Sequence, residues 1–189
     1  LLGLHRGDRL DYIVSLTTKG RGDDALAGRV NTSLLRTVKG AGILLQLDVM
    51  TPRPYSRLQT VCGTEGYAQK YPLPTLSTRE TNGILTAAEA LHEAARYETG
   101  PASRYWHEGH ARHVPNEMNY AMDARLIYCL RHGLPLDIDV YDAAEWSCLT
   151  ELSEISAREG SRPVPIPDFT GGRWNLLHGH RFYTADNAG

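Results

Sequence analysis

The stretch Leu10-Asp-Tyr-Ile-Val-Ser-Leu-Thr17 indicates a β-strand near the start of the chain. Its residues form two alternating sets, Leu10, Tyr12, Val14 and Leu16 in one and Asp11, Ile13, Ser15 and Thr17 in the other. A period of two is typical of a strand with one buried face and one face in contact with solvent. The sequence therefore predicts a sheet that begins with this strand.

Four further strand-like stretches follow, at residues 30–38, 43–49, 55–62 and 67–71. Two of the connections are glycine-containing turn sequences, Lys39-Gly-Ala-Gly42 and Gly63-Thr-Glu-Gly66. Strands joined by such short turns run in opposite directions, because a parallel crossover needs a dozen or more residues. We therefore expect an antiparallel meander, in which 43–49 is the most apolar strand and a central one.

Helical patterns fill the second half of the chain. The capping-box sequence Thr86-Ala-Ala-Glu89 predicts a helix that runs to about Tyr97. A second helix begins near Pro115 and ends before Gly133. A third covers residues 139–158. The last two helices have apolar side chains at helical spacing, Met118, Met122, Leu126 and Leu130 in one and Val140, Ala144, Cys148, Leu152 and Ile155 in the other.

The proline-rich segment 163–167 is expected to be extended, because each proline disfavours helix at its own position and at the preceding one. Strands that precede helices in this way are typical of the α+β class. The predicted fold is therefore an open, mainly antiparallel β-sheet with helices packed on one face.

Composition excludes several classes of protein. The 189 residues are 41% hydrophobic, and 20 Lys and Arg against 22 Asp and Glu give a net charge of −2. This balance predicts one soluble domain with no nucleic-acid partner, since no excess of positive charge is present to neutralise phosphates. The apolar run Ile43–Leu45 is far too short for a membrane span. Three cysteines without a CxxC pair, which are Cys62, Cys129 and Cys148, are interpreted as small buried side chains.

Two motifs could bind a metal or a nucleotide, and neither has the required spacing. The segment His107-Glu-Gly-His110 departs from HExxH and has a glycine in its centre, so we interpret its histidines as exposed loop residues and predict no metal site. Gly40-Ala-Gly42 has Leu45 where a dinucleotide fingerprint needs its third glycine, and a strand follows it. It is interpreted as a hairpin turn, and no cofactor-binding residue is predicted in this chain.

The segment Thr51-Pro-Arg-Pro-Tyr55 is the third candidate. Prolines on both sides of Arg53 stiffen the backbone, and the Tyr55 phenol there could donate a hydrogen bond to a sugar hydroxyl. The same residues also fit a kink at a strand end with an amphipathic tyrosine at the sheet edge. The acidic run Asp137–Asp142 lies at a predicted helix start, where carboxylates cap free amides, so we interpret it as structural.

Several blocks of sequence, in this order, resemble the C-terminal part of the Gfo/Idh/MocA oxidoreductase superfamily. The resemblance is closest to its branch of NAD-dependent α-N-acetylgalactosaminidases, and it covers the chain from Leu1 to about Trp174. The blocks are Arg6-Gly-Asp-Arg-Leu-Asp-Tyr12, Arg53-Pro-Tyr55 with Gly63-Thr-Glu-Gly66, Leu134-Pro-Leu-Asp137 with Asp139-Val-Tyr-Asp142 and Trp146, and Ile166-Pro-Asp-Phe-Thr170.

In that family, an N-terminal Rossmann domain binds NAD and the C-terminal domain presents an open sheet to the nicotinamide and the sugar. The resemblance implies that NAD oxidises C3 of the sugar, that the glycosidic bond then leaves by elimination, and that the hydride returns after water has added. It also implies that Tyr55 contacts the sugar and that Arg53 supports it. A family histidine falls at Pro115 here, so its role passes to a neighbour such as His113 or is absent.

The resemblance predicts a substrate-binding and oligomerisation domain at residues 1–174 and a tail at 175–189. The Rossmann domain and the family's Tyr-Pro-Thr-His stretch are absent from this chain, so the catalytic residues are not identified and the chain alone is expected to be inactive.

The predicted function is the substrate-binding domain of an NAD-dependent glycosidase that acts on an N-acetylgalactosaminide-like sugar. The alternatives are a non-catalytic oligomerisation or carbohydrate-binding module and an NAD(P)-dependent sugar dehydrogenase. An open sheet without a covering domain exposes apolar surface, so we also expect a homo-oligomer formed through the sheet. The cellular location is left open between the cytoplasm and export.

Overall fold

The computed structural model describes residues 2–18, 30–81, 83–98, 100–177 and 182–186. The chain divides into two compact units, the first formed by Leu1–Pro52 together with Cys129–Gly189 and the second by Arg53–Tyr128. Part of the expected tail at 175–189 lies outside the described residues. Within the described ranges, no helix is both long and apolar enough to cross a membrane.

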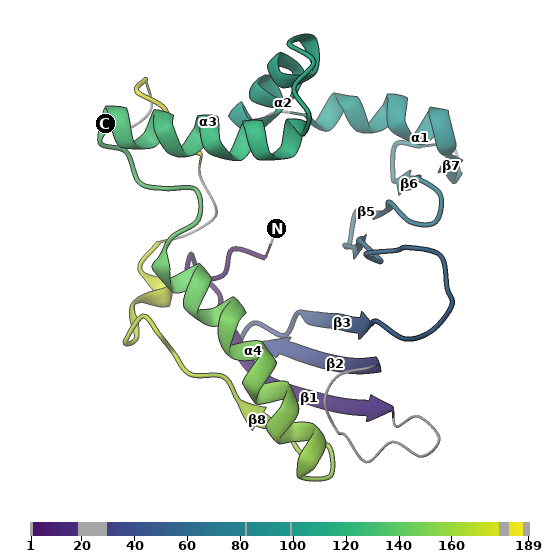
Figure 1. The fold of residues 1–189 in the computed structure, drawn as a ribbon, viewed down its shortest axis with the longest axis vertical. Coiled ribbons are helices and arrows are strands. Elements are labelled where there is room, and N and C mark those ends of the chain that lie inside the picture. The colour runs from purple at the N-terminus through teal and green to yellow at the C-terminus, as the bar shows by residue number, and fades with distance from the viewer. Residues whose placement is uncertain (1, 19–29, 82, 99, 178–181, 187–189) are drawn as a thin grey trace. The chain divides into compact units, whose positions relative to one another are not determined.

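The first unit contains a four-stranded antiparallel sheet with the order β3-β2-β1-β8 (Figure 1). Its strands are β1 (Leu10–Thr18), β2 (Val30–Thr37), β3 (Gly42–Asp48) and β8 (Val164–Pro165). The Gly40–Gly42 segment is the β2–β3 hairpin turn, as predicted, and the Thr37 amide donates to Ala41 O at 2.9 Å. The extended conformation predicted for the proline-rich segment is also confirmed, because it forms β8.

The prediction that β3 is a central strand is wrong. β3 lies at the edge of its sheet, and its Leu45 and Leu47 are about half exposed. The two inner positions belong to β2 and β1, and β1 pairs with β2 on one side and with the distant β8 on the other. A two-residue strand that returns from the end of the chain has no local sequence pattern that could have revealed this order.

A β-bulge in β1 determines which of its side chains are buried. Leu10 pairs with Thr37 and Tyr12 pairs with Arg36, so Asp11 is the extra residue. The inserted residue brings Leu10 and Ile13, which belong to different sets of the alternation, into the same core. Leu16 is 61% exposed as a consequence.

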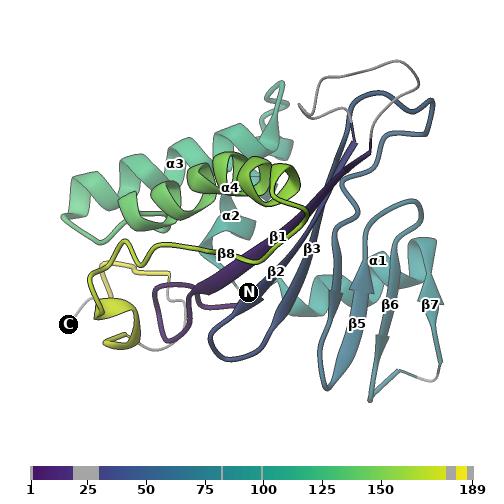
Figure 2. The same cartoon turned by 90° about the horizontal axis from the view of Figure 1, so that it is seen from below.

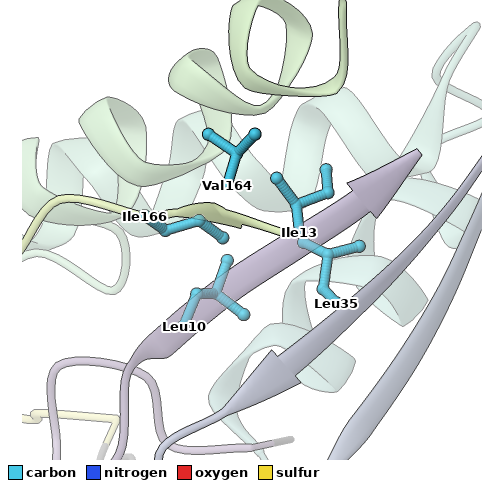
Figure 3. Packing of buried hydrophobic residues seen from close by; sticks show 5 residues of the cluster. All are labelled: Leu10, Ile13, Leu35, Val164 and Ile166. Carbon is cyan, nitrogen blue, oxygen red and sulfur yellow. The ribbon is translucent and has the colours of Figure 1, made fainter. Parts of the chain in front are cut away.

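The core of the first unit lies between this sheet and helix α4 (Val140–Arg158), which packs along β1 (Figure 2). Figure 3 shows its five buried apolar side chains, which are Leu10, Ile13, Leu35, Val164 and Ile166. From α4, the side chains of Cys148, Leu149, Leu152 and Ile155 pack against this cluster.

The apolar stripe predicted for α4 is only partly correct. Cys148, Leu152 and Ile155 contact the core, whereas Val140 is 72% exposed. The buried positions of the helix are polar: Asp142, Glu145 and Ser156. Helix α4 therefore attaches to its unit by hydrogen bonds and ion pairs as well as by apolar packing.

The second unit contains a separate antiparallel sheet with the order β4-β5-β6-β7. Its strands are β4 (Thr60–Cys62), β5 (Gly66–Gln69), β6 (Thr75–Thr78) and β7 (Leu85–Thr86), and Figure 2 shows the last three in succession. Helix α1 (Ala87–Ala94) packs against β6 and β7 and continues into the 3-10 helix η1 (Ala95–Tyr97). Helices α2 (Pro101–Ala111) and α3 (Glu117–His132) follow, and the division between the units falls within α3.

The α+β class with open antiparallel sheets is confirmed, and the structure divides the strands between two sheets. The strand expected at 55–62 is limited to Thr60–Cys62, because the residues before it are irregular. Among the cysteines, Cys129 is buried as predicted but Cys62 is exposed.

The prediction of a loop at the His-rich segment is wrong, because that segment forms α2. Pro101 occupies the first turn, where its missing amide costs nothing. Gly109 is buried inside the helix, and a Cβ there would lie 3.0 Å from Cδ1 of Tyr120. The glycine is therefore explained by the close approach of the Tyr120 ring rather than by a helix break.

Of the two predicted helix starts with capping residues, one is confirmed. Asp139 caps α4, accepting from the amides of Tyr141 and Asp142, while the Asp142 carboxylate accepts from the Asp139 amide. Thr86 precedes α1 but makes no capping hydrogen bond through its side chain, so the predicted Thr86–Glu89 box is wrong. The backbone of Thr86 instead pairs with Thr75, as part of the pairing of β7 with β6.

Candidate functional site

The three predicted site residues all lie in the second unit. Arg53 and Tyr55 occupy the irregular segment before β4, and His113 follows α2 with a left-handed φ of 54°. All three are exposed. In the part of the chain that the structure describes, no hydrogen bond or ring contact joins His113 to Tyr55.

The β4–β5 hairpin determines what lies beside Tyr55. Thr60 pairs with Gln69, and the Lys70 amide extends this register by donating to Gln59 O at 3.0 Å. Tyr71 follows Lys70 directly in the chain. Leu58 and Gln59 both have left-handed φ angles, 61° and 43°, so the chain turns sharply just after the Tyr55 segment.

Tyr55 and Tyr71 form an edge-to-face aromatic pair. Their ring centroids are 5.9 Å apart and their planes are inclined by 87°. Such pairs contribute about 0.5–1.5 kcal/mol beyond the area that they bury. Tyr55 remains 69% exposed, so the pair fixes the ring while leaving most of it accessible to a ligand.

Arg57 completes the arrangement around Tyr55. Its Nε donates a hydrogen bond to Tyr55 Oη at 2.5 Å, and its Cζ lies 5.9 Å from the centroid of the same ring. This hydrogen bond raises the pKa of the Arg57 guanidinium. Lys70 Nζ lies 5.8 Å from the centroid of Tyr71, so each ring of the pair has a cation beside it.

The sequence did not identify Arg57 or Tyr71 as site residues. Tyr71 is sixteen positions from Tyr55, and the two meet through the β4–β5 hairpin together with the sharp turn at Leu58 and Gln59. The turn sequence Gly63-Thr-Glu-Gly66 was the available signal, because it fixes which residues of the two strands face each other.

A second polar cluster lies in the first unit, where the N-terminal segment meets the start of α4. Arg6 Nη2 lies 3.2 Å from Asp142 Oδ2 and 3.5 Å from Asp139 Oδ2. Burial alone would raise the pKa of Asp142, but the hydrogen bond from Arg6 and the Asp139 amide hold it below its usual value. The carboxylates predicted to be structural are therefore helix caps that also bind Arg6.

His5 and Glu145 lie beside this cluster and are both almost completely buried. His5 Nε2 is 3.2 Å from Glu145 Oε2, and Glu145 Oε1 accepts from the Leu10 amide at 3.1 Å. Burial raises the pKa of Glu145. Because a substrate cannot reach these atoms, the pair acts on the structure of the unit and not on a ligand.

The α2 histidines pair with carboxylates at the surface. His107 Nε2 lies 2.8 Å from Glu98 Oε2, and His110 Nδ1 lies 3.3 Å from Glu117 Oε1. A hydrogen bond from its own backbone and one from His110 lower the pKa of Glu117. Over the described residues, no group of three or more His, Cys, Asp or Glu side chains is arranged to hold a metal ion.

Comparison with solved structures shows where this fold occurs. An oxidoreductase from Agrobacterium radiobacter, solved in complex with NAD+, L-tartaric acid and magnesium, is similar over 83% of this chain and 43% of its own, with a TM-score of 0.55 and 18% identity. An oxidoreductase domain protein from Kribbella flavida is similar over 85% of this chain and 47% of its own, with a TM-score of 0.56 and 14% identity. Because the sequence identities are this low, the comparison shows that the folds are similar and nothing more.

Sequence comparison is more specific. An α-N-acetylgalactosaminidase from Bacteroides fragilis is 52% identical over 94% of this chain, and a glycosyl hydrolase family 109 protein from Porphyromonas gingivalis is 44% identical over 98%. The chain spans 46% of the length of each of these relatives. Residues 1–176 match the family described as glycosyl hydrolase 109, C-terminal domain, and the chain therefore belongs to that family, as its sequence blocks predicted.

Proposed function

We propose that this chain is the substrate-binding part of an NAD-dependent α-N-acetylgalactosaminidase, in which Tyr55 contacts the sugar. The identity to the Bacteroides fragilis enzyme supports the reaction class. The exposed ring of Tyr55 supports the assignment of the sugar contact, because Arg57 and Tyr71 hold the ring in place and leave one of its faces accessible. Residues 1–174 would then serve as the substrate and oligomerisation domain.

The Gly40–Gly42 segment does not have the geometry of a dinucleotide site. Gly40 and Gly42 belong to the β2–β3 hairpin, whereas a pyrophosphate is bound where a glycine-rich turn leads from a strand into a helix. The cofactor would be held by another part of the enzyme.

The contribution of this chain is to bind and orient the sugar. An aromatic ring with one open face suits the apolar face of a sugar, and a phenol can donate to a sugar oxygen. Fixing a substrate against its reaction partner supplies part of the rate enhancement of many enzymes. Arg53 and His113 are exposed within the same unit and are proposed as further substrate-binding residues.

We also propose that the chain forms a homo-oligomer through its first sheet. Three leucines lie on the face of the sheet that does not contact the α4 core, and they remain 57–61% exposed: Leu16, Leu34 and Leu44. Burying this apolar surface against a second copy would be favourable, because contiguous exposed apolar side chains are uncommon on monomeric proteins.

A chimaera tests the proposed function. The chain is fused behind the N-terminal part of the Bacteroides fragilis enzyme that it does not cover, and release of nitrophenol from p-nitrophenyl α-N-acetylgalactosaminide is measured with NAD. We expect hydrolysis by the chimaera, about a tenfold loss of kcat/KM for Tyr55→Phe, and none by the N-terminal part alone. In calorimetry, the 189-residue chain alone should not bind NAD.

Two outcomes would overturn the proposal. One is a folded chimaera that does not hydrolyse the substrate while the Bacteroides fragilis enzyme does so under the same conditions. The other is micromolar binding of NAD by the isolated chain, which would place the cofactor site within it.

A further inference from the structure

The hydrogen bond between Arg57 and Tyr55 has only one possible direction. A guanidinium has five N–H donors and no acceptor, so Tyr55 Oη must accept from Arg57 Nε. The phenol proton is consequently not used in this bond. It is available for donation to a different acceptor.

The described part of the chain supplies no such acceptor. Tyr55 Oη makes its hydrogen bond with Arg57, and no carbonyl or carboxylate of the described residues accepts from it. Tyr67 shows the opposite arrangement on the neighbouring β5, since its Oη donates to Gln69 Oε1 at 2.5 Å. Of these two tyrosines, only Tyr55 presents its O–H to solvent.

The backbone around Arg57 is arranged at some energetic cost. The two residues after it, Leu58 and Gln59, both adopt left-handed φ angles that are unfavourable for side chains with a Cβ. The Leu58 amide donates a hydrogen bond to Ser56 Oγ at 3.0 Å, and the Lys70 amide donates one to Gln59 O. These contacts hold the turn in the conformation that brings Arg57 back onto Tyr55.

We propose that Arg57 and Tyr71 are positioning residues, which fix the Tyr55 phenol so that it donates to an acceptor oxygen of the bound sugar. Arg57 occupies the acceptor side of the phenol oxygen, and the edge of Tyr71 fixes the plane of the ring. This inference rests on the proposed function for the identity of the ligand. It assigns the donor role to Tyr55 and the orientation to its two neighbours.

A double-mutant cycle in the chimaera tests the assignment. Arg57→Gln should lower kcat/KM about 3- to 10-fold in the wild-type background, because one hydrogen bond is lost. It should change kcat/KM less than about 1.5-fold when Tyr55→Phe is already present, since Arg57 then has no phenol on which to act. Arg57→Lys should retain part of the activity, and Arg96→Gln, which removes an exposed cation of the same unit, should have no effect.

A spectroscopic measurement on the isolated chain is independent of catalysis. The Cζ resonance of ¹³C-labelled Tyr55 reports the hydrogen bonds of its oxygen, and Arg57→Gln should shift it while Arg96→Gln leaves it in place. Tyr71→Leu should change the ring resonances of Tyr55 through the loss of the edge-to-face contact.

The outcomes separate this inference from the proposed function. A Tyr55 resonance unchanged by Arg57→Gln, or equal losses of kcat/KM from Arg57→Gln in both backgrounds, would overturn the positioning role. An inactive wild-type chimaera whose Tyr55 resonance responds to Arg57→Gln would overturn the proposed function and leave Arg57 as the residue that orients the phenol.

Discussion

Ser156 Oγ on α4 accepts a hydrogen bond from the backbone amide of Ser15 on β1, at a distance of 2.9 Å. The same hydroxyl donates to Arg162 O at 2.6 Å, beyond the end of the helix. Both serines are almost completely buried. One side chain therefore joins three backbone segments of the first unit, where water is excluded.

The Ser156→Ala variant should unfold more easily than the wild type. It leaves the Ser15 amide and Arg162 O without this partner, which we expect to lower the free energy of unfolding by about 2 kcal/mol. Urea titration followed by circular dichroism measures the change. Ser153→Ala, on the same helix, removes only a hydroxyl bound to Thr150 O and should cost less than about 0.5 kcal/mol. Equal losses for the two variants would contradict the role of the buried hydroxyl.

Two helix starts should respond differently to the loss of their N-cap side chain. Asp139→Ala removes a carboxylate that binds two amides, and we expect a loss of about 1–2 kcal/mol in the free energy of unfolding. Thr86→Ala removes a side chain that makes no capping hydrogen bond, so its effect should stay below about 0.5 kcal/mol. The same urea titration compares them, and a larger effect at Thr86 would argue against the cap geometry described above.

The ion pair of Arg6 with Asp142 should stabilise the protein above acidic pH. Because the folded state lowers the pKa of Asp142 below its reference value of 3.8, this stability is present above that pH. It is lost as the pH falls through the lower pKa of the folded state. Asp142→Asn should therefore cost about 1–2 kcal/mol at pH 7 and progressively less as the pH falls below 3.8.

Thermal unfolding across this pH range is the measurement. The matched control is Glu154→Gln, which breaks the exposed Arg158–Glu154 pair and should change stability by less than about 0.5 kcal/mol at either pH. If the cost of Asp142→Asn did not vary with pH, the ion pair would not be its source.

The contribution of Glu145 to stability should depend on pH in the opposite direction to that of Asp142. Burial raises the pKa of its carboxyl above the reference value of 4.5, so the folded state binds this proton more tightly than the unfolded state. Its contribution to stability is therefore greatest below pH 4.5 and is lost as the pH rises through the folded pKa. His5, Asp142, Arg9 and the Leu10 amide are the groups that act on it.

Glu145→Gln keeps an acceptor for the Leu10 amide and cannot ionise. It should remove this part of the pH dependence, so that the variant gains stability relative to the wild type between pH 4.5 and pH 7. Parallel urea titrations at several pH values test it. A stability difference that stays constant over this range would show that Glu145 does not titrate with a raised pKa.

The proposed oligomer should depend on the exposed leucines of the first sheet. Leu34→Lys places a charge in the centre of this face and should convert the oligomer to monomers in size-exclusion chromatography with light scattering. Leu91→Lys, at a similarly exposed leucine of α1, should leave the assembly unchanged. A wild-type chain that remains monomeric at high concentration would contradict the proposal.

The sequence predicted the parts of the fold that depend on local pattern. Alternation and turn residues identified β1, β2 and β3 and the Gly40–Gly42 hairpin, and helical spacing identified α3 and α4. Each of these elements is determined by residues close to one another in the chain.

What escaped prediction depends on contacts between distant residues. β3 lies at an edge because the next strand along the chain, β4, belongs to a separate sheet, and Gly109 is tolerated in α2 because Tyr120 packs against it. At the candidate site, Tyr55 was recognised from its motif. Its orientation depends on Arg57 and Tyr71, and Tyr71 reaches it through the β4–β5 hairpin and the turn at Leu58 and Gln59.

The division of the first unit between two segments of the chain has a consequence for biosynthesis. A ribosome makes residues 53–128 before it reaches α4 and β8, so the second unit can emerge and fold while the first sheet still lacks a strand. During that interval, the backbone of β1 has no partner on the side of Val164 and lacks the Ser156 hydroxyl. A nascent chain stalled before residue 156 should therefore depend on chaperones to keep β1 from pairing with other chains.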